Sequence, residues 1–258
     1  MDTAFEIVSE LIDGNGFALL PDLINRDEAH AARELLLSSD AAVLVPGAPS
    51  SKPRTRQRTI RGLLDRGEIF ERLVLHPTII SVAEAMLGED MTLSSYAARI
   101  LEPGAIEMGA HVDYPYWAMR GPFTVRPALM LQVIWMMQDF TADNGATMVV
   151  PKSQLRCDFP DPARFASEAV KITGNAGSAI VSHGLLWHDT GQNHTEAPRV
   201  SMLINYGMKI IHPMESDIGN VGPEVLARAT PKMRQLLGLE FQASLGNDLK
   251  RRRSTYSA

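Results

Sequence analysis

Two side chains that could share one metal ion stand two residues apart, at His111 and Asp113. If this segment lies at the end of a strand, residues two apart project from the same face, so the imidazole and the carboxylate can bind one ion. The spacing alone is weak evidence, because a surface pair or a capping pair shows the same pattern. A third ligand must therefore come from elsewhere in the chain.

A candidate for that third ligand is His188, which lies 75 residues beyond Asp113 and has His183 and His194 as neighbouring rivals. We favour His188 over these two rivals because the spacings of Gly191, Asn193 and Arg199 all refer to His188. Two histidines and one carboxylate form the facial triad of non-haem iron(II) oxygenases, which leaves positions open for further ligands. The same donors also suit zinc, so a metal-dependent hydrolase remains an alternative.

Arg199 follows His188 by 11 residues, at the start of an apolar run. A guanidinium inside a β core is unfavourable unless it meets an anion, and its planar fork fits a carboxylate. The distal carboxylate of 2-oxoglutarate is the candidate anion. A structural ion pair is the alternative.

The elements that must position these side chains are mainly strands. Short apolar runs separated by Gly, Pro, Asn and Asp turns are typical of an all-β core. We expect strands within residues 17–20, 91–101, 128–140, 146–150, 169–173, 178–181 and 200–211, the first of them buried.

Helices are expected to flank this core. Capping residues and 3.6-residue periodicity predict helices at residues 3–12, 25–37, 69–87 with a soft break at Pro77, and 223–239. Residues 45–61 lack periodicity and are expected to form a mobile basic loop, either a solvated surface, which is favoured, or a flap over a negatively charged substrate. Its basic residues are Lys52, Arg54, Arg56, Arg58 and Arg61.

Composition narrows the function classes. A net charge of -5 and a pI near 5.8 give no reason to expect nucleic acid or an anionic membrane as the partner, so a small molecule is expected. The single cysteine, Cys157, rules out an internal disulfide and suits the reducing cytoplasm. No signal sequence or membrane-length apolar run is visible, and we expect one cytoplasmic domain over residues 1–249 with a flexible basic tail at 250–258.

From about residue 15 to residue 210 the chain resembles the phytanoyl-CoA dioxygenase-like branch of the iron(II)/2-oxoglutarate oxygenases. The order of several motifs is more specific than any one of them. The segments that carry the resemblance are residues 15–21, His111-Val112-Asp113, Trp135 with Asp139, residues 144–153, residues 188–193 and Arg199.

This resemblance implies a mainly β fold with flanking helices, a double-stranded β-helix of the cupin-like jelly-roll type, with the metal at its open mouth. It assigns His111, Asp113 and His188 to iron(II), and Arg199 to the 2-oxoglutarate carboxylate. Thr190 would touch the same carboxylate. In relatives, the residue that corresponds to Trp135 lines the cosubstrate pocket, although a core position is the alternative.

The sequence departs from the family pattern at two places. Many relatives have glutamine where this chain has Val112, so one polar contact near the iron is expected to be missing. The family's usual Pro-Gly-Ser-His is replaced by residues 151–154, Pro-Lys-Ser-Gln, which questions the local loop but not the metal site. Asp113 itself distinguishes the chain from related halogenases, in which a small residue replaces the carboxylate.

The expected activity is therefore that of a dioxygenase that uses iron(II), 2-oxoglutarate and O2 and releases succinate and CO2. It would hydroxylate, desaturate, epoxidise or cyclise a small metabolite, with secondary metabolism as the setting. Tyr114, Tyr116 and Trp117, beside the metal ligands, are candidates for contact with the substrate, or else rim and core residues. A catalytically silent cupin-like binding protein is the further alternative, and both a monomer and a homodimer are open.

Overall fold

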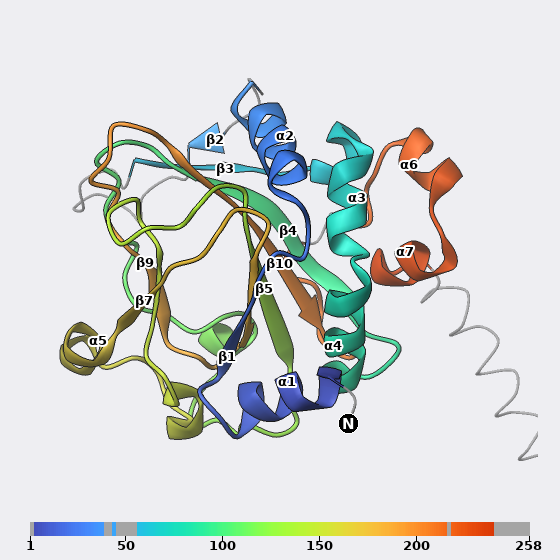
Figure 1. The fold of residues 1–258 in the computed structure, drawn as a ribbon. Coiled ribbons are helices and arrows are strands. Elements are labelled where there is room, and N and C mark those ends of the chain that lie inside the picture. Colours follow the sequence, from blue (N-terminus) through green and yellow to red (C-terminus); the bar gives the residue numbers. More distant parts are fainter. Residues whose placement is uncertain (1–2, 39–42, 45–55, 216–217, 240–258) are drawn as a thin grey trace, which may run out of the picture.

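Two antiparallel sheets form the centre of the molecule (Figure 1). The computed structural model describes residues 3–38, 43–44, 56–215 and 218–239. The strands are β1 (Phe17–Leu20), β2 (Val43–Leu44), β3 (Gln57–Ile60), β4 (Thr92–Leu101), β5 (Met130–Met136), β6 (Thr147–Val149), β7 (Val170–Ile172), β8 (Ala179–His183), β9 (His188–Thr190) and β10 (Arg199–Gly207). The larger sheet has the order β1-β8-β5-β10-β4-β3-β2 and the smaller one β7-β6-β9. This two-sheet arrangement confirms the predicted jelly roll.

Helices cover the outer face of the larger sheet, where α4 contacts β5 and α1 contacts β1 and β8 (Figure 1). The helices are α1 (Thr3–Ile12), α2 (Arg26–Leu37), α3 (Glu68–Val74), α4 (Pro77–Leu87), α5 (Pro162–Glu168), α6 (Pro223–Arg228) and α7 (Pro231–Leu236). Three short 3-10 turns complete the described elements: η1 (Leu63–Arg66), η2 (Tyr116–Ala118) and η3 (Ser153–Arg156). Asn25 caps α2 as expected, its side chain accepting a hydrogen bond from the Glu28 amide.

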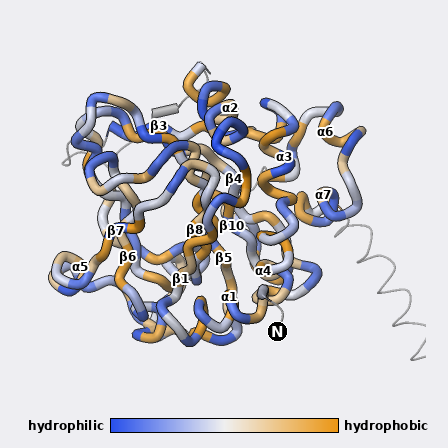
Figure 2. The backbone as a smooth tube through the Cα atoms, in the orientation of Figure 1, coloured by the Kyte–Doolittle hydropathy of each residue, from blue (hydrophilic) through white to orange (hydrophobic). Residues whose placement is uncertain are grey.

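The central strands have two different faces. Successive side chains of a strand point to opposite sides, so β10 turns Met202 and Tyr206 toward the helices and Arg199 and Ser201 toward the interior of the jelly roll. Figure 2 shows hydrophobic stretches in the central strands, with hydrophilic stretches in the surrounding loops and on outer helices such as α2. The helix-facing side therefore forms the main apolar core, and the opposite side is left to build a site.

Several predicted boundaries needed correction. The expected single helix over 69–87 is two helices, α3 and α4, because Pro77 begins a new helix. The helix expected over 223–239 is likewise divided into α6 and α7, with Thr230 capping the second. The 17–20 strand exists, but it is an edge strand and is only partly buried, since Leu19 is 37% exposed.

The prediction of a structureless basic loop over 45–61 is wrong for its last part. Residues 57–60 are strand β3, which pairs with β4 in the register Thr59↔Arg99. The basic residues concealed this strand because Arg58 points outward to an ion pair with Glu102, while Gln57 and Thr59 are buried. Residues 45–55 and the predicted tail at 250–258 lie outside the described residues.

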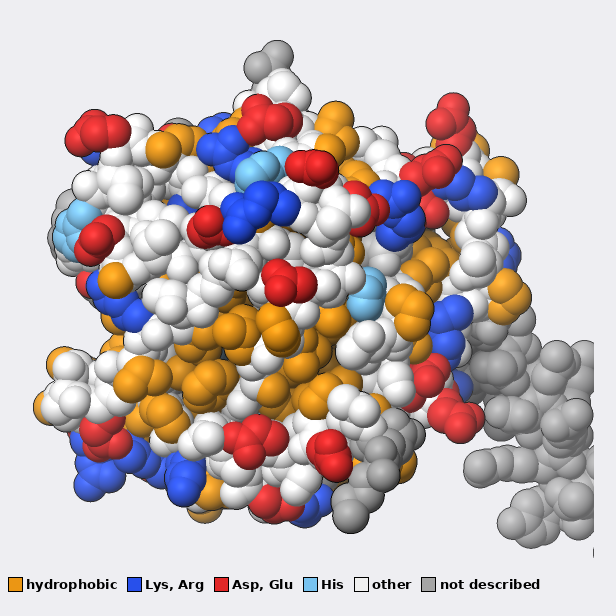
Figure 3. Space-filling model, viewed as in Figure 1, with side chains coloured by type: hydrophobic (Ala, Val, Ile, Leu, Met, Phe, Trp, Pro, Cys, Tyr) orange, Lys and Arg blue, Asp and Glu red, His pale blue; other side chains and the backbone are white. Residues whose placement is uncertain are grey.

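Apolar side chains gather on one outer face over β1 and β7, with charged side chains around them (Figure 3). Each of these strands lies at the edge of its sheet and exposes an apolar residue, Leu19 in β1 and Val170 in β7. Over the described ranges, no helix has both the length and the apolar character needed to cross a membrane.

Candidate metal centre

The two candidate histidine ligands are direct partners across a β-bridge. The His111 amide donates to the His188 carbonyl oxygen at 3.0 Å, and the His188 amide donates back to the His111 carbonyl oxygen at 3.1 Å. Directly opposed residues of an antiparallel pair place their side chains side by side, and here the ring centroids are 4.3 Å apart. Chain segments 77 residues apart are thus joined at the two candidate ligands themselves (188 − 111).

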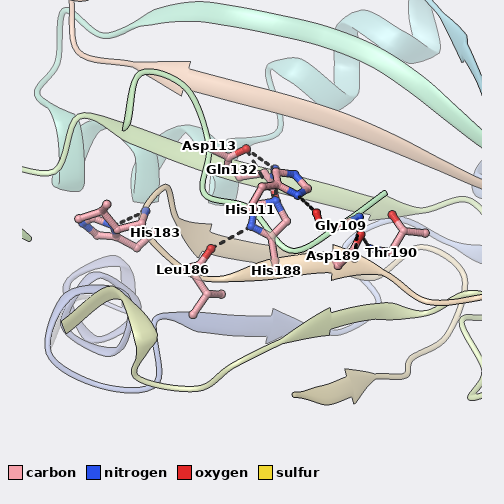
Figure 4. A network of polar contacts seen from close by, with 10 residues as sticks. Gly109, His111, Asp113, Gln132, His183, Leu186, His188, Asp189 and Thr190 are labelled. Atoms are coloured by element: carbon pink, nitrogen blue, oxygen red, sulfur yellow. Dashed lines mark hydrogen bonds and ion pairs between the residues drawn. The ribbon is translucent and has the colours of Figure 1, made fainter. Parts of the chain in front are cut away.

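Backbone carbonyls fix how both imidazoles are turned. His111 Nδ1 lies 2.9 Å from the Gly109 carbonyl oxygen, and His188 Nδ1 lies 2.9 Å from the Leu186 carbonyl oxygen (Figure 4). A carbonyl can only accept, so each Nδ1 carries the proton and each Nε2 keeps its lone pair. Burial lowers the pKa of His188, and burial together with His188 lowers the pKa of His111 to about 4. Both rings are therefore neutral at physiological pH, which is the form that binds metal.

Asp113 completes the group from the loop after His111. Its amide donates to the Gly184 carbonyl oxygen at 2.8 Å, and its carboxylate Oδ1 lies 3.8 Å from His188 Nε2. The carboxylate is buried, and its second oxygen, Oδ2, has no hydrogen-bond partner. Burial raises the pKa of Asp113 to about 7, which is the expected response of a carboxylate taken out of water.

Gln132, on β5, lies between two of the three candidate metal ligands, Asp113 and His188. Its Nε2 donates to Asp113 Oδ1 at 2.9 Å and lies 3.4 Å from His188 Nε2, while its own Oε1 is buried without a partner. Within the described part of the chain, no three His, Cys, Asp or Glu side chains already surround one point. Gln132 therefore contacts two of the three candidate ligands, Asp113 and His188.

Asp189 ties the two ligand segments together, a role that spacing did not suggest. Its two carboxylate oxygens accept hydrogen bonds from the amides of Met108 at 3.1 Å, Gly109 at 3.0 Å and Thr190 at 2.7 Å. The first two amides belong to the segment that leads into His111. The only sequence signal for this contact is that Asp189 directly follows a ligand.

A cavity of about 460 Å³ opens beside the two histidines and Asp113. Its remaining polar lining comes from the interior face of the larger sheet and from β9. Two residues predicted to bind the cosubstrate, Thr190 and Arg199, are part of this lining. The residues that line the cavity around the candidate ligands are Gln132, Ile134, Thr147, Asp189, Thr190, Arg199, Ser201, Leu203 and Asn205.

Arg199 is buried in the cavity wall and is oriented by three contacts. Its Nη1 donates to Ser201 Oγ at 2.7 Å, its Nη2 donates to the Gly145 carbonyl oxygen, and its guanidinium carbon lies 4.4 Å from the centre of the Phe140 ring. Its Nε has no partner, and the described residues offer it no carboxylate. Burial, and to a smaller extent the nearby Arg99, lower the pKa of Arg199 to about 9. A bound anion would relieve this unfavourable environment.

Two predicted site residues are not in the cavity. Trp135 lies on the opposite face of β5 from Gln132 and Ile134 and packs in the helix-facing core, where its ring meets His76. The expectation that Trp135 lines the cosubstrate pocket is therefore wrong, because residues an odd number apart on a strand face opposite sides. Tyr116 is also a core residue, with its hydroxyl bonded to the Leu129 amide.

The other two aromatic candidates, Tyr114 and Trp117, do line the cavity, with their ring centroids 5.7 Å apart. Trp117 is 55% exposed, so it belongs to the rim. The rival histidines are accounted for elsewhere. His183 is buried with both ring nitrogens in hydrogen bonds, to the Leu185 amide and the Val125 carbonyl, and His194 is exposed.

The loop that departs from the family pattern is well formed. Lys152, at the position of the usual glycine, adopts the left-handed conformation with φ 64°. Ser153 Oγ accepts a hydrogen bond from the Trp187 amide at 2.8 Å, and Gln154 donates to the Gly14 carbonyl oxygen at 3.1 Å. Ser153 thus contacts the residue before His188, and the Lys-Ser-Gln sequence keeps the loop in place.

Comparison with known proteins agrees with this geometry. The family model described as phytanoyl-CoA dioxygenase matches residues 12–201. An iron/alpha-ketoglutarate-dependent dioxygenase, ausU, from Aspergillus calidoustus is 26% identical over 92% of this chain and 82% of its own. A dioxygenase, af480, from Aspergillus fumigatus is also 26% identical, over 87% of this chain and 74% of its own.

Solved structures share the fold. The epimerase SnoN from nogalamycin biosynthesis, in complex with Fe3+, alpha ketoglutarate and nogalamycin RO, has a TM-score of 0.62 at 20% identity, covering 80% of this chain and 84% of its own. HygX from Streptomyces hygroscopicus, with nickel, 2-oxoglutarate and hygromycin B bound, has a TM-score of 0.63 at 15% identity, covering 83% and 89%.

Proposed function

Because the chain belongs to the phytanoyl-CoA dioxygenase family, we propose that His111, Asp113 and His188 hold the iron(II) of a non-haem, 2-oxoglutarate-dependent dioxygenase. The enzyme consumes 2-oxoglutarate and O2, releases succinate and CO2, and oxidises a small organic metabolite. The names of relatives support this assignment, since ausU is an iron/alpha-ketoglutarate-dependent dioxygenase, SnoN is an epimerase from nogalamycin biosynthesis, and HygX was solved with 2-oxoglutarate and hygromycin B bound.

The side chains present fit a divalent iron. Two neutral imidazoles whose Nε2 atoms carry the lone pair and one carboxylate with an unpartnered oxygen form a mixed nitrogen and oxygen donor set, which is the set of the facial triad. A dication would also satisfy the buried Asp113 oxygen that the protein leaves without a donor. Because burial raises the pKa of Asp113 to about 7, binding of the ion would displace the carboxyl proton near neutral pH.

When bound, iron and 2-oxoglutarate supply the oxidising chemistry: one oxygen atom of O2 enters succinate, and the other is used to oxidise the substrate. The protein's residues do the positioning. The carbonyls of Gly109 and Leu186 hold the His111 and His188 rings in one tautomer, and the Asp189 carboxylate fastens the segment before His111 to β9. Such outer contacts set ligand orientation and metal affinity.

Arg199 is the residue proposed to bind the distal carboxylate of 2-oxoglutarate. Its guanidinium is held by Ser201, Gly145 and Phe140 before any anion arrives, so little side-chain freedom is lost on binding. Thr190, in the same cavity wall, is proposed to add a hydroxyl contact. The buried, partnerless Nε of Arg199 supports this assignment.

The primary substrate is proposed to be a small molecule that enters past Tyr114 and Trp117. A cavity of about 460 Å³ accommodates a small metabolite together with the cosubstrate. The product is proposed to be a hydroxylated, desaturated, epoxidised or cyclised form of that metabolite.

The observation that carries this proposal is the His111–His188 bridge, which sets two neutral imidazoles beside Asp113 at a cavity that also contains a buried arginine to which the described residues offer no carboxylate. The test is anaerobic titration of the purified chain with iron(II) and 2-oxoglutarate. We expect a weak metal-to-ligand absorption band, and succinate formation once O2 is admitted.

His188→Ala should abolish both signals, whereas His194→Ala, which changes an exposed histidine of the same segment, should leave both unchanged. Absence of the band and of succinate in the wild-type protein would refute the proposal. Metal-dependent hydrolysis without O2, supported by zinc, would instead favour a hydrolase at the same residues.

A further inference from the structure

The cavity is lined by a second arginine, Arg99, whose presence is not explained by binding of the cosubstrate. Arg99 lies on β4, directly opposite Ser201 of β10 on one side and Thr59 of β3 on the other. All three residues line the cavity. One carboxylate of 2-oxoglutarate needs one arginine fork, and Arg199 is already oriented for it. Arg99 is therefore available for a different anion.

Arg99 has no partner of its own in the described part of the protein. Its Nη1 is buried without a hydrogen-bond acceptor, and no carboxylate lies within ion-pair distance of the side chain. Burial and the nearby Arg61 lower the pKa of Arg99. Arg58, on the outer side of the adjacent strand, differs sharply, because its Nε meets Glu102 at 2.6 Å. The outward-facing arginine is neutralised by the protein and the inward-facing one is not.

Thr59, the cross-strand neighbour of Arg99, also has a side-chain polar group without a partner. Its hydroxyl is buried, faces the cavity and has no hydrogen-bond partner. Directly opposed residues of adjacent strands have Cβ atoms about 5 Å apart, so the Thr59 and Arg99 side chains leave the sheet side by side on the cavity face. A hydroxyl donor beside a guanidinium is a suitable arrangement for a carboxylate, which accepts from both.

The position of this pair favours the primary substrate over the cosubstrate. Across the larger sheet the order runs β5, β10, β4, β3, with Gln132 of the metal centre on β5 and Arg199 on β10. Arg99 and Thr59 lie on the next two strands, farther from the metal corner. Their neighbours in the cavity lining include Arg61 and Met214, both exposed to solvent, so the cavity also reaches solvent on this side.

We propose that Arg99 and Thr59 form a second anion-binding subsite, which selects a primary substrate that carries a carboxylate. This proposal rests on the proposed function only in that it takes the other ligand of the cavity to be 2-oxoglutarate on Arg199. It names organic acids as the substrate class and predicts that neutral analogues bind poorly.

The first test needs no ligand. Arg99 is half-buried, its buried Nη1 has no partner, and two other arginines lie near it, so Arg99→Met should leave the melting temperature of the metal-free protein unchanged or raise it. Arg199→Met, which breaks the bonds to Ser201 and Gly145, should lower the melting temperature. A marked loss of stability in Arg99→Met would show that Arg99 is structural and would overturn the proposal.

The second test measures binding by calorimetry, with carboxylic acids and their primary amides as matched probes, namely hexanoate with hexanamide and benzoate with benzamide. The protein is used metal-free and also anaerobically with iron(II) and 2-oxoglutarate. We expect at least one acid to bind about tenfold more tightly than its amide, and we expect Arg99→Met and Thr59→Val to remove that preference. The affinity for 2-oxoglutarate should change less than about threefold in Arg99→Met and fall strongly in Arg199→Met.

Two results would overturn the subsite. In the first, no acid binds better than its amide in the wild-type protein. In the second, Arg99→Met weakens 2-oxoglutarate as strongly as Arg199→Met does, which would assign Arg99 to the cosubstrate. Failure of the proposed function gives a different result, namely no succinate from the wild-type protein, and the titrations of the metal-free protein still report on Arg99.

Discussion

The two faces of the larger sheet are built from the same strands but have opposite chemistry. On the helix-facing side, buried hydroxyls have acceptors, as when Tyr96 donates to the Phe70 carbonyl at 2.8 Å and Tyr206 to the Val74 carbonyl at 2.6 Å. On the cavity side, several buried polar atoms of the described residues lack partners. They are Gln57 Oε1, Thr59 Oγ1, Arg99 Nη1, Asp113 Oδ2, Gln132 Oε1, Arg199 Nε and Asn205 Oδ1.

The difference between the faces shows where the protein is stabilised and where it binds. Unpartnered buried polar groups oppose folding, and a protein tolerates several of them in one place when a ligand is to satisfy them. The helix-facing side has its own exception, since Trp135 Nε1 and His76 Nδ1 are also without partners. The comparison nevertheless predicts that substitutions on the cavity face change binding, and that substitutions on the helix face change stability.

The largest effect is expected from Asp113→Asn, which should weaken iron(II) binding by roughly 10³-fold or more, since losing even an outer contact of a metal ligand costs about 10–100-fold. The metal-free protein should become more stable. Burial raises the pKa of Asp113 to about 7, so between about pH 4 and pH 7 the unfolded chain has released a proton that the folded chain retains. This group's contribution to stability therefore declines as the pH rises through that window.

The free energy of unfolding of Asp113→Asn should not show that decline. Above pH 7 it should exceed the wild-type value by on the order of 2–4 kcal/mol. Urea unfolding of the two metal-free proteins between pH 4 and pH 8 measures the difference, and calorimetry measures iron binding. A variant that is less stable than the wild type at every pH would break the comparison between the faces.

The next effect comes from a matched pair of neighbours on β10. Met202 is fully buried against the helices, so Met202→Ala should lower the free energy of unfolding by about 2–5 kcal/mol without changing the KM for 2-oxoglutarate. Ser201 faces the cavity and accepts from Arg199, so Ser201→Ala should change stability by about 1 kcal/mol or less while raising that KM several-fold. Equal losses of stability in both variants would contradict the two-face interpretation.

The sequence was sufficient to propose candidate ligands because that proposal depends on residue type. Imidazole, carboxylate and guanidinium groups have few roles in a β core, so His111, Asp113, His188 and Arg199 could be proposed from chemistry and order along the chain. The structure brings the first three together and places the fourth in the same cavity. The strands could also be predicted from the sequence, because β strands between turn residues appear as short apolar segments.

What could not be predicted was which side of a strand each residue faces. Residues 130–136 are apolar on both sides except at Gln132, because both faces of β5 are buried. That single polar residue was the available signal: it marks the cavity face, and Trp135, three positions later, must then face the helices. The Asp189 contacts could not be predicted either, since they join segments about 80 residues apart whose pairing no local pattern reveals.

A smaller effect is expected from Asp189→Asn, which acts on the metal centre through the backbone. The amide side chain offers one acceptor oxygen where the carboxylate offers two, so at least one of the Met108, Gly109 and Thr190 amides loses its partner. Iron(II) affinity should fall about tenfold, the lower limit for contacts of this type. Asp158→Asn, at an exposed aspartate that also accepts a backbone amide, is the control. Unchanged iron affinity in Asp189→Asn would show that Asp189 does not position His111.

The smallest effect is expected at Lys152, which lies on neither face of the sheet. Its φ of 64° is a conformation that side chains with a Cβ adopt at some cost and glycine adopts freely. Lys152→Gly should therefore raise the free energy of unfolding by about 0.5–1 kcal/mol, with part of the relief offset by the greater freedom of glycine in the unfolded chain. Lys152→Ala keeps the Cβ and should show no gain, which separates backbone strain from loss of the charge. Iron and 2-oxoglutarate binding should be unchanged in both variants, because the cavity does not include this residue. A gain in Lys152→Ala equal to that in Lys152→Gly would mean that the lysine charge, rather than its backbone conformation, opposes folding at this turn.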